Sequence, residues 1–312
     1  MSVASCRDAI LTSGTAVNGL HLAYRFDGPP SGAPVVLIHG LGQTLVDWPE
    51  AFIERLTNAG CRVLRLDNRD IGRSSRLDHL GAPPLLRLWF SAALRLPMLA
   101  QSPYSLADMA TDVVGLLDAL GVGAAHLVGA SMGGMIAQRV AVTHPERVLS
   151  LTSIMSSSGA PGLPSPRKDV QAAFARDAEP IDPALAVETA RRFRLLIGGR
   201  MRSGDLPEFE SRVARSVEYG RPGGGGAARQ YAAIFADRHR YRLLCRIRSR
   251  CLVLHGEEDP LVPLAHGVDT AARIANSRFV AIRGMGHEIT LSSGQTLAEE
   301  ILAHLNLADG DR

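Results

Sequence analysis

The sequence has few of the features that mark nucleic-acid-binding, secreted or membrane-spanning proteins. Its 312 residues include one lysine, the net charge is +3, and aromatic residues make up only 5%. No basic stretch is interleaved with aromatic side chains, which argues against nucleic-acid binding. No apolar run reaches the roughly 18 residues of a spanning helix, and the N-terminus lacks a basic region followed by an apolar run. We therefore expect a cytoplasmic protein.

Cysteine is also scarce. The four cysteines are Cys6, Cys61, Cys245 and Cys251, and their spacing matches no metal site. Cys61 and Cys251 begin apolar runs that are typical of buried strands. This position predicts reduced structural thiols in place of disulfides. No His, Cys and Asp residues recur at ligand spacing either, so we expect neither a metal nor a cofactor.

Residues 83–100 are apolar enough to touch a membrane, but Arg87, Arg95 and three prolines interrupt them. A spanning helix needs a longer uninterrupted apolar run. We expect these residues to form a helix packed near the mouth of a binding pocket, with no stable membrane anchor.

Short runs rich in Val, Ile and Leu alternate with longer helical patterns, which is typical of βα units in a mainly parallel sheet. Residues 20–26 alternate apolar and polar side chains and are predicted to form an antiparallel edge strand. Ser105, with Asp108 three residues later, predicts the start of an amphipathic helix, and a second helix is expected over 132–143. The expected strands of this sheet are 33–40, 61–67, 124–131, 147–154, 250–257 and 277–284.

The βα alternation stops between residues 158 and 243, where proline and glycine separate helical fragments. We interpret 158–243 as a helical lid inserted into an α/β core that comprises residues 1–157 and 244–312. Because open α/β sheets bind ligands at the carboxyl ends of their strands, the insertion should cover that edge and select the substrate.

The strongest chemical motif is Gly129-Ala130-Ser131-Met132-Gly133, which follows a buried strand and opens a helix. This is the context of a nucleophile elbow, in which a sharp turn exposes a serine and brings neighbouring backbone close. Small residues two positions before and after the serine fit that geometry. Ser131 is therefore the predicted nucleophile.

A serine hydroxyl needs a base and a group that orients the base, and in this arrangement both follow the serine in the chain. Of the downstream histidines, only His287 lies in a glycine-rich loop directly after a predicted strand. Asp259, in a proline-fixed turn after another strand, is the expected orienting acid. Glu257 and Glu258 remain competing candidates.

An acyl-transfer enzyme also needs donors for the developing oxyanion, commonly backbone N–H groups. The residue after the nucleophile, Met132, supplies one. The segment HGLG at 39–42, directly after VVLI, supplies another, with Leu41 as the expected donor. His39 precedes the serine in the chain and is interpreted as a brace for this loop, with proton transfer as the alternative.

Five segments together resemble blocks of the α/β-hydrolase superfamily. The resemblance covers nearly the whole chain, from the expected strand at 20–26 through the expected helix at 292–305. Asp70 stands where the superfamily pattern D-x-R-G-x-G-x-S often has glycine, and this variant is similar to the aclacinomycin methylesterase-like branch and to an esterase–lipase branch. Arg69 and Asp70 are expected to form a buried ion pair that braces the active-site loops. The five segments are HGLG at 39–42, DNRDIGRS at 67–74, GASMGG at 129–134, GEEDPLVP at 256–263 and GMGH at 284–287.

The resemblance implies cleavage of a carboxylic ester of a small molecule through an acyl-enzyme on Ser131. It excludes the haloalkane dehalogenase and epoxide hydrolase branches, which have aspartate at this position. Hydrolysis of a C–C bond, an enol-lactone or a thioester, or perhydrolysis, is the alternative on the same residues. A further alternative is a ligand-binding protein that keeps the fold without turnover.

Overall fold

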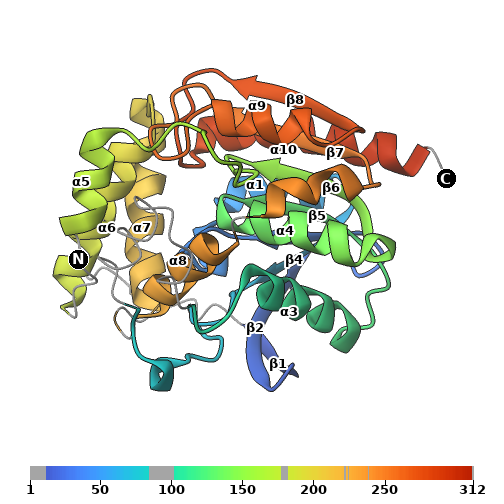
Figure 1. Ribbon diagram of the computed structural model, residues 1–312, viewed down its shortest axis with the longest axis horizontal. Coiled ribbons are helices and arrows are strands. Elements are labelled where there is room, and N and C mark those ends of the chain that lie inside the picture. The colour runs from blue at the N-terminus through green and yellow to red at the C-terminus, as the bar shows by residue number, and fades with distance from the viewer. Residues whose placement is uncertain are drawn as a thin grey trace, which may run out of the picture.

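In the computed structural model, residues 12–83, 102–176, 182–220, 223, 225–237 and 239–310 are described. They form one eight-stranded sheet in the order β1-β2-β4-β3-β5-β6-β7-β8, with helices on both faces (Figure 1). The helix expected within 83–100 falls almost wholly outside the described residues. The strands are β1 (Ser13–Val17), β2 (Leu20–Asp27), β3 (Ala33–Ile38), β4 (Cys61–Leu66), β5 (Ala125–Ala130), β6 (Val148–Ile154), β7 (Cys251–Gly256) and β8 (Ser277–Ile282).

From β4 to β8 every neighbouring pair of strands is parallel, and all six expected strands are present, although β8 at the edge of the sheet is mostly half-buried. The expectation of an edge strand at 20–26 is wrong, because β2 lies between β1 and β4 and is antiparallel to both. The outer strand β1 pairs with β2 through a two-residue turn at Asn18 and Gly19, both with positive φ (51° and 78°). Asn-Gly is a strong hairpin signal, and it could have revealed β1 from the sequence.

Two helical layers cover the sheet and bury its apolar strands. On one face, the strands pack against α3 (Leu106–Ala119), α4 (Met132–Thr143) and α9 (Ala265–Ala272). On the other face, α1 (Glu50–Asn58) and α10 (Leu291–Gly310) pack against each other and the sheet. α3 begins as expected, since the Ser105 hydroxyl accepts a hydrogen bond from Asp108 N–H and the Asp108 carboxylate accepts one from Ser105 N–H.

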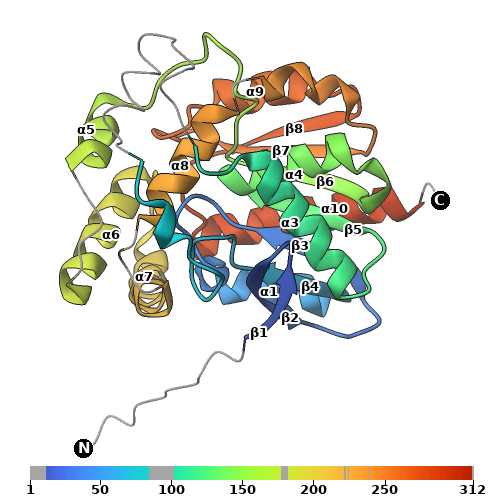
Figure 2. The same cartoon turned by 60° about the horizontal axis from the view of Figure 1, so that its bottom comes forward.

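Between β6 and β7, in the segment interpreted from the sequence as an insertion, the described residues form four α-helices. They are α5 (Lys168–Arg176), α6 (Pro183–Ile197), α7 (Leu206–Gly220) and α8 (Gly226–Ala236). Figures 1 and 2 show them gathered at one end of the sheet, with α8 nearest to it. Backbone and side-chain contacts join them to the loops after β3, β4 and β8, so this end is the one where the parallel strands terminate.

Among the helices of the described residues, none combines the length and the apolar character that crossing a membrane would require. Cys61 and Cys251 are buried at the first positions of β4 and β7, as the sequence predicts.

Candidate active site

Ser131 occupies a sharp turn between the end of β5 and the start of α4. Its φ is 54°, a conformation that residues with side chains rarely adopt and that costs about 1–3 kcal/mol. The Ser131 N–H donates to the Ile154 carbonyl of β6 over 2.9 Å, and the Ser156 hydroxyl donates to the Ser131 carbonyl over 2.7 Å. These bonds hold the strained turn, in which Ser131 is half-buried.

The two glycines around Ser131 are required by close backbone approach. A Cβ on Gly133 would lie 1.9 Å from the Ile38 carbonyl oxygen, and one on Gly129 would lie 2.3 Å from the Gly133 carbonyl oxygen. No side chain fits at such distances. The motif that the sequence presents is therefore a packing requirement of the turn between β5 and α4.

Ser131, His287 and Asp259 form a continuous hydrogen-bonded chain. Ser131 Oγ lies 2.9 Å from His287 Nε2, and His287 Nδ1 lies 2.7 Å from Asp259 Oδ2. An ionised carboxylate can only accept, so Nδ1–H donates to Asp259 and the other ring nitrogen of the neutral imidazole is free to accept from the serine. The fold thus brings together, from three separate loops, the three residues that the sequence selects.

Asp259 is held ionised although it is only 6% exposed. Burial by itself would raise the pKa of its carboxyl, but attraction to His287 and His255, together with the hydrogen bond from His287, lowers that pKa to about 2. Its second oxygen accepts from the N–H groups of Leu261 and Val262, over 2.9 and 2.7 Å. These bonds fix the carboxylate toward the imidazole.

The competing carboxylates point elsewhere. The side chains of Glu257 and Glu258 are exposed, and the two ring nitrogens of His287 bond to Asp259 and Ser131 instead. Their backbone N–H groups donate to the carbonyls of Ile282 and Met285, over 3.1 and 3.0 Å. They thereby join the loop after β7 to the loop after β8 and place Asp259 beside His287.

The two residues predicted to donate to the oxyanion lie in segments next to Ser131. Gly40 lies directly against the serine, because a Cβ on Gly40 would be 3.1 Å from Ser131 Cβ. The next residue is Leu41, and Met132 follows the serine at the first position of α4. Within the described residues, the N–H groups of Leu41 and Met132 have no hydrogen-bond acceptor, so both can donate to a bound oxygen.

His39 directly follows β3, next to Gly40 and Leu41, and is 3% exposed. Its Nδ1 accepts from Gly40 N–H over 2.8 Å, and its ring packs against Trp48 with centroids 4.5 Å apart. Burial lowers the pKa of His39 to about 4, so the ring is neutral near pH 7. This geometry fits the interpretation of His39 as a brace for the loop.

A family model described as the alpha/beta hydrolase fold matches residues 33–293, which is most of the chain. The chain belongs to the α/β-hydrolase family. Rhodomycin D methylesterase DauP from Streptomyces sp. (strain C5) is 32% identical over 305 residues, which cover 90% of this chain and 93% of that protein. Rhodomycin D methylesterase DnrP from Streptomyces peucetius is 31% identical, with the same coverage of both proteins.

Among solved structures, a hydrolase from Pseudomonas aeruginosa PA01 superposes with a TM-score of 0.70 at 28% identity, covering 96% of this chain and 99% of that one. Together these matches confirm the fold, the resemblance to a methylesterase-like branch, and the prediction that this α/β-hydrolase is an ester-hydrolysing enzyme.

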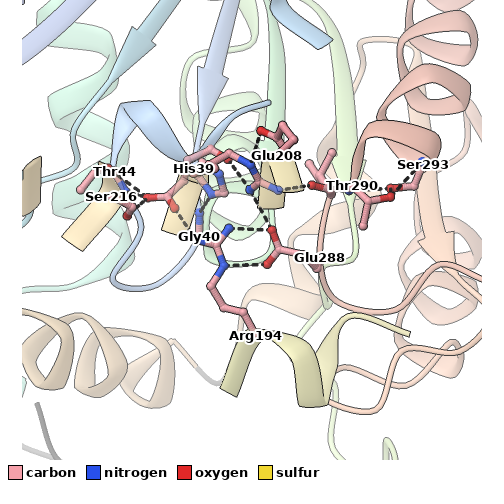
Figure 3. A network of polar contacts seen from close by, with 12 residues as sticks. His39, Gly40, Thr44, Arg194, Glu208, Ser216, Glu288, Thr290 and Ser293 are labelled. Carbon is pink, nitrogen blue, oxygen red and sulfur yellow. Dashed lines mark hydrogen bonds and ion pairs between the residues drawn. The ribbon is translucent and has the colours of Figure 1, made fainter. Parts of the chain in front are cut away.

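Behind the His287 loop of this α/β-hydrolase lies a buried network of charged side chains (Figure 3). The Glu288 carboxylate, 2% exposed, accepts two hydrogen bonds from Arg194 of α6, at 2.6 and 2.8 Å, and one from Arg212 of α7, at 2.8 Å. Arg194 also donates to Asp47, at 2.6 Å. Arg212 also donates to the half-buried Glu208, at 2.9 Å. Each of the two arginines is thus paired with at least two carboxylates, which is the condition for a buried ion cluster to be tolerated.

This network joins α6 and α7 to the loop that carries His287. Next to it, the N–H of His287 donates to the Ile197 carbonyl at the end of α6, over 2.6 Å, and Gly286 N–H donates to the Gly198 carbonyl, over 3.2 Å. The position of the imidazole therefore depends on the helices between β6 and β7 as well as on the sheet. Glu288 was not among the residues predicted from the sequence, where its place next to His287 is the only local signal.

We expect Glu288→Gln to lower the free energy of unfolding by about 3–5 kcal/mol, because Arg194 and Arg212 lose the buried carboxylate that they share and keep only Asp47 and the half-buried Glu208 as partners. Denaturant unfolding followed by circular dichroism would measure the change in midpoint. Glu257→Gln is the matched control, since Glu257 is exposed, and it should stay within about 0.5 kcal/mol of wild type. A loss below about 1 kcal/mol for Glu288→Gln would mean that these charges are weakly coupled.

The predicted ion pair between Arg69 and Asp70 is wrong. Arg69 Nε instead lies 2.6 Å from Asp112 of α3, and Asp70 pairs with Arg229 of α8 at 2.8 Å. Asp70 has a φ of 75°, and the sharp turn there directs the two neighbouring side chains to different helices. Each of the two pairs still braces the loop after β4, as expected, but against α3 and α8.

Within the parts of the chain that the structure describes, no three His, Cys, Asp or Glu side chains are grouped so that they could hold a metal ion.

Proposed function

We propose that this chain is a serine esterase in which Ser131 is the nucleophile, His287 the general base and acid, and Asp259 the residue that orients the imidazole. The observation that carries the proposal is the hydrogen-bonded chain from Ser131 Oγ to His287, at 2.9 Å, and on to Asp259, at 2.7 Å. A serine in a strained turn, with a neutral imidazole positioned to accept its proton, is arranged for nucleophilic attack.

In the first half of the reaction, Ser131 Oγ attacks the ester carbonyl carbon while its proton passes to His287 Nε2. The N–H groups of Leu41 and Met132 donate to the oxyanion of the tetrahedral intermediate. When the bond to the leaving oxygen breaks, His287 gives its proton to the departing alcohol, and the acyl group remains on Ser131. Water then attacks the acyl-enzyme, with His287 as base, and the carboxylic acid leaves as the serine regains its proton.

We further propose that the substrate is a methyl ester of a larger acid, by analogy with the two relatives named as methylesterases. The segment 158–243 acts as a cap that selects this acid, because its helices α6, α7 and α8 contact the loops that carry the reacting groups. No metal or other cofactor takes part in the proposed reaction.

A fluorophosphonate probe and a substrate panel test the proposal. The probe should label the wild-type protein at Ser131. In a panel of methyl esters, a thioester, an enol-lactone and a dienone, kcat/KM should be highest for the methyl esters. A separate assay of peracid formation tests perhydrolysis. A preference for one of the other substrates would reassign the chemistry on the same residues. Absence of labelling and of all turnover would indicate a ligand-binding protein.

A further inference from the structure

Helix α8 is seated on two loops that border the candidate active site. A Cβ on Gly226, the first residue of α8, would lie 2.3 Å from the Asp70 carbonyl oxygen. The following residue, Ala227, faces Gly42 of the loop after β3, where an added Cβ would lie 3.6 Å from Ala227 Cβ. The first turn of α8 is therefore in direct contact with the segment that contains Leu41.

Gln230 of α8 connects these two loops through both ends of its amide. Its Oε1 accepts from Gly42 N–H over 2.9 Å, and its Nε2 donates to the Arg69 carbonyl over 2.9 Å. The side chain is completely buried. A buried amide with both ends bonded to backbone fixes the distance between the segments it joins.

The neighbouring Arg229 anchors α8 in this position. Its guanidinium donates to both oxygens of Asp70, at 2.8 and 2.9 Å, and also to the Gly81 carbonyl and the Asp78 carboxylate, each at 2.8–2.9 Å. Burial alone would raise the pKa of Asp70, but these hydrogen bonds from Arg229 lower it, so the pair is ionised. Asp70, at a position where the family pattern often has glycine, thus serves to hold α8.

The backbone N–H groups on either side of Leu41 are hydrogen-bonded, whereas that of Leu41 is not. Gly40 N–H is bonded to His39 Nδ1 at 2.8 Å, and Gly42 N–H is bonded to Gln230 Oε1 at 2.9 Å. Between them, the N–H of Leu41 has no acceptor among the described residues. The loop is therefore fixed on both sides of the one amide that is left to donate to a substrate oxygen.

We propose that Gln230 is a positioning residue of the oxyanion hole, which aligns the Leu41 N–H by holding the next amide of the loop. This inference rests on the proposed serine-esterase function. It assigns to the segment between β6 and β7 a part in stabilising the transition state, in addition to substrate selection. A misaligned donor would weaken binding of the oxyanion more than binding of the uncharged ester.

The test is Gln230→Met, which keeps the length of the side chain and removes both hydrogen bonds. With a 4-nitrophenyl ester, kcat should fall by about 10- to 100-fold while KM changes by less than about threefold. The affinity for phenylboronic acid, which forms a tetrahedral adduct with a serine hydroxyl, should fall by a factor similar to that of kcat/KM. A merely structural residue would not weaken the tetrahedral adduct selectively.

Gln138→Met is the matched control, because Gln138 is an equally buried glutamine whose amide bonds to Ser153 and Arg240, away from the Leu41 loop. Its kcat and boronate affinity should stay within about threefold of wild type. If Gln230→Met does not fold, Gln230→Asn replaces it, since the shorter amide cannot reach both loops.

A folded Gln230 variant with wild-type kcat and boronate affinity would overturn the inference, and so would equal weakening of boronate and ester binding. Neither result would affect the proposed function, which depends on fluorophosphonate labelling of Ser131.

Discussion

Ser131→Ala should reduce kcat for ester hydrolysis by on the order of 10⁴ to 10⁶. The backbone bonds of this residue, from its N–H to Ile154 and from Ser156 to its carbonyl, do not involve the side chain. The substitution therefore removes the nucleophile and its bond to His287, while the turn between β5 and α4 can persist. Residual turnover would come from the oxyanion donors and from substrate binding alone. Steady-state kinetics on a methyl ester and loss of fluorophosphonate labelling would measure both effects.

Ser150→Ala provides a matched control for this experiment. Ser150 on β6 is fully buried, and its Oγ lies 2.8 Å from Nδ1 of His126 on the neighbouring strand β5. The two residues form a second serine–histidine pair. It lies toward the opposite end of these strands from Ser131, and its alanine variant should keep kcat within about threefold of wild type. Retention of a tenth of the wild-type turnover in Ser131→Ala would eliminate the proposed nucleophile.

Asp259→Asn should reduce kcat by roughly 10⁴. The asparagine carbonyl oxygen can still accept from the N–H groups of Leu261 and Val262, so its NH₂ group then faces His287. A neutral imidazole next to that donor takes the tautomer that accepts at Nδ1 and carries its proton on Nε2. His287 would then present an N–H to Ser131 and could not accept the hydroxyl proton.

Circular dichroism and fluorophosphonate labelling rates would separate this effect from unfolding, because a folded variant with slow labelling has lost the base and kept the serine. Glu258→Gln is the control, since the exposed Glu258 is the neighbouring carboxylate that the sequence left as a competitor. A large loss of kcat in Glu258→Gln with little loss in Asp259→Asn would reverse the assignment of the orienting acid.

The reacting residues could be selected from the sequence because each is marked by its own short segment. Ser131 stands between glycines that the turn requires, and His287 and Asp259 each follow a strand of the parallel sheet. Carboxyl ends of parallel strands converge at one edge, so local patterns were enough to predict which side chains meet. The strands and the capped start of α3 follow from apolar periodicity and capping chemistry in the same way.

Only the tertiary structure decided what supports those residues. The contacts of Glu288 with Arg194 and Arg212, and of Gln230 with Gly42, join positions 76 to 188 residues apart in the chain. Buried polar partners of this kind carry no spacing signal, because any arginine of the segment between β6 and β7 could have served. The same reason explains why the predicted pairing of Arg69 with Asp70 is wrong. In the structure, Arg69 pairs with Asp112 of α3 and Asp70 pairs with Arg229 of α8. Local sequence determined the reacting groups, whereas long-range packing of charged and amide side chains determined how they are held.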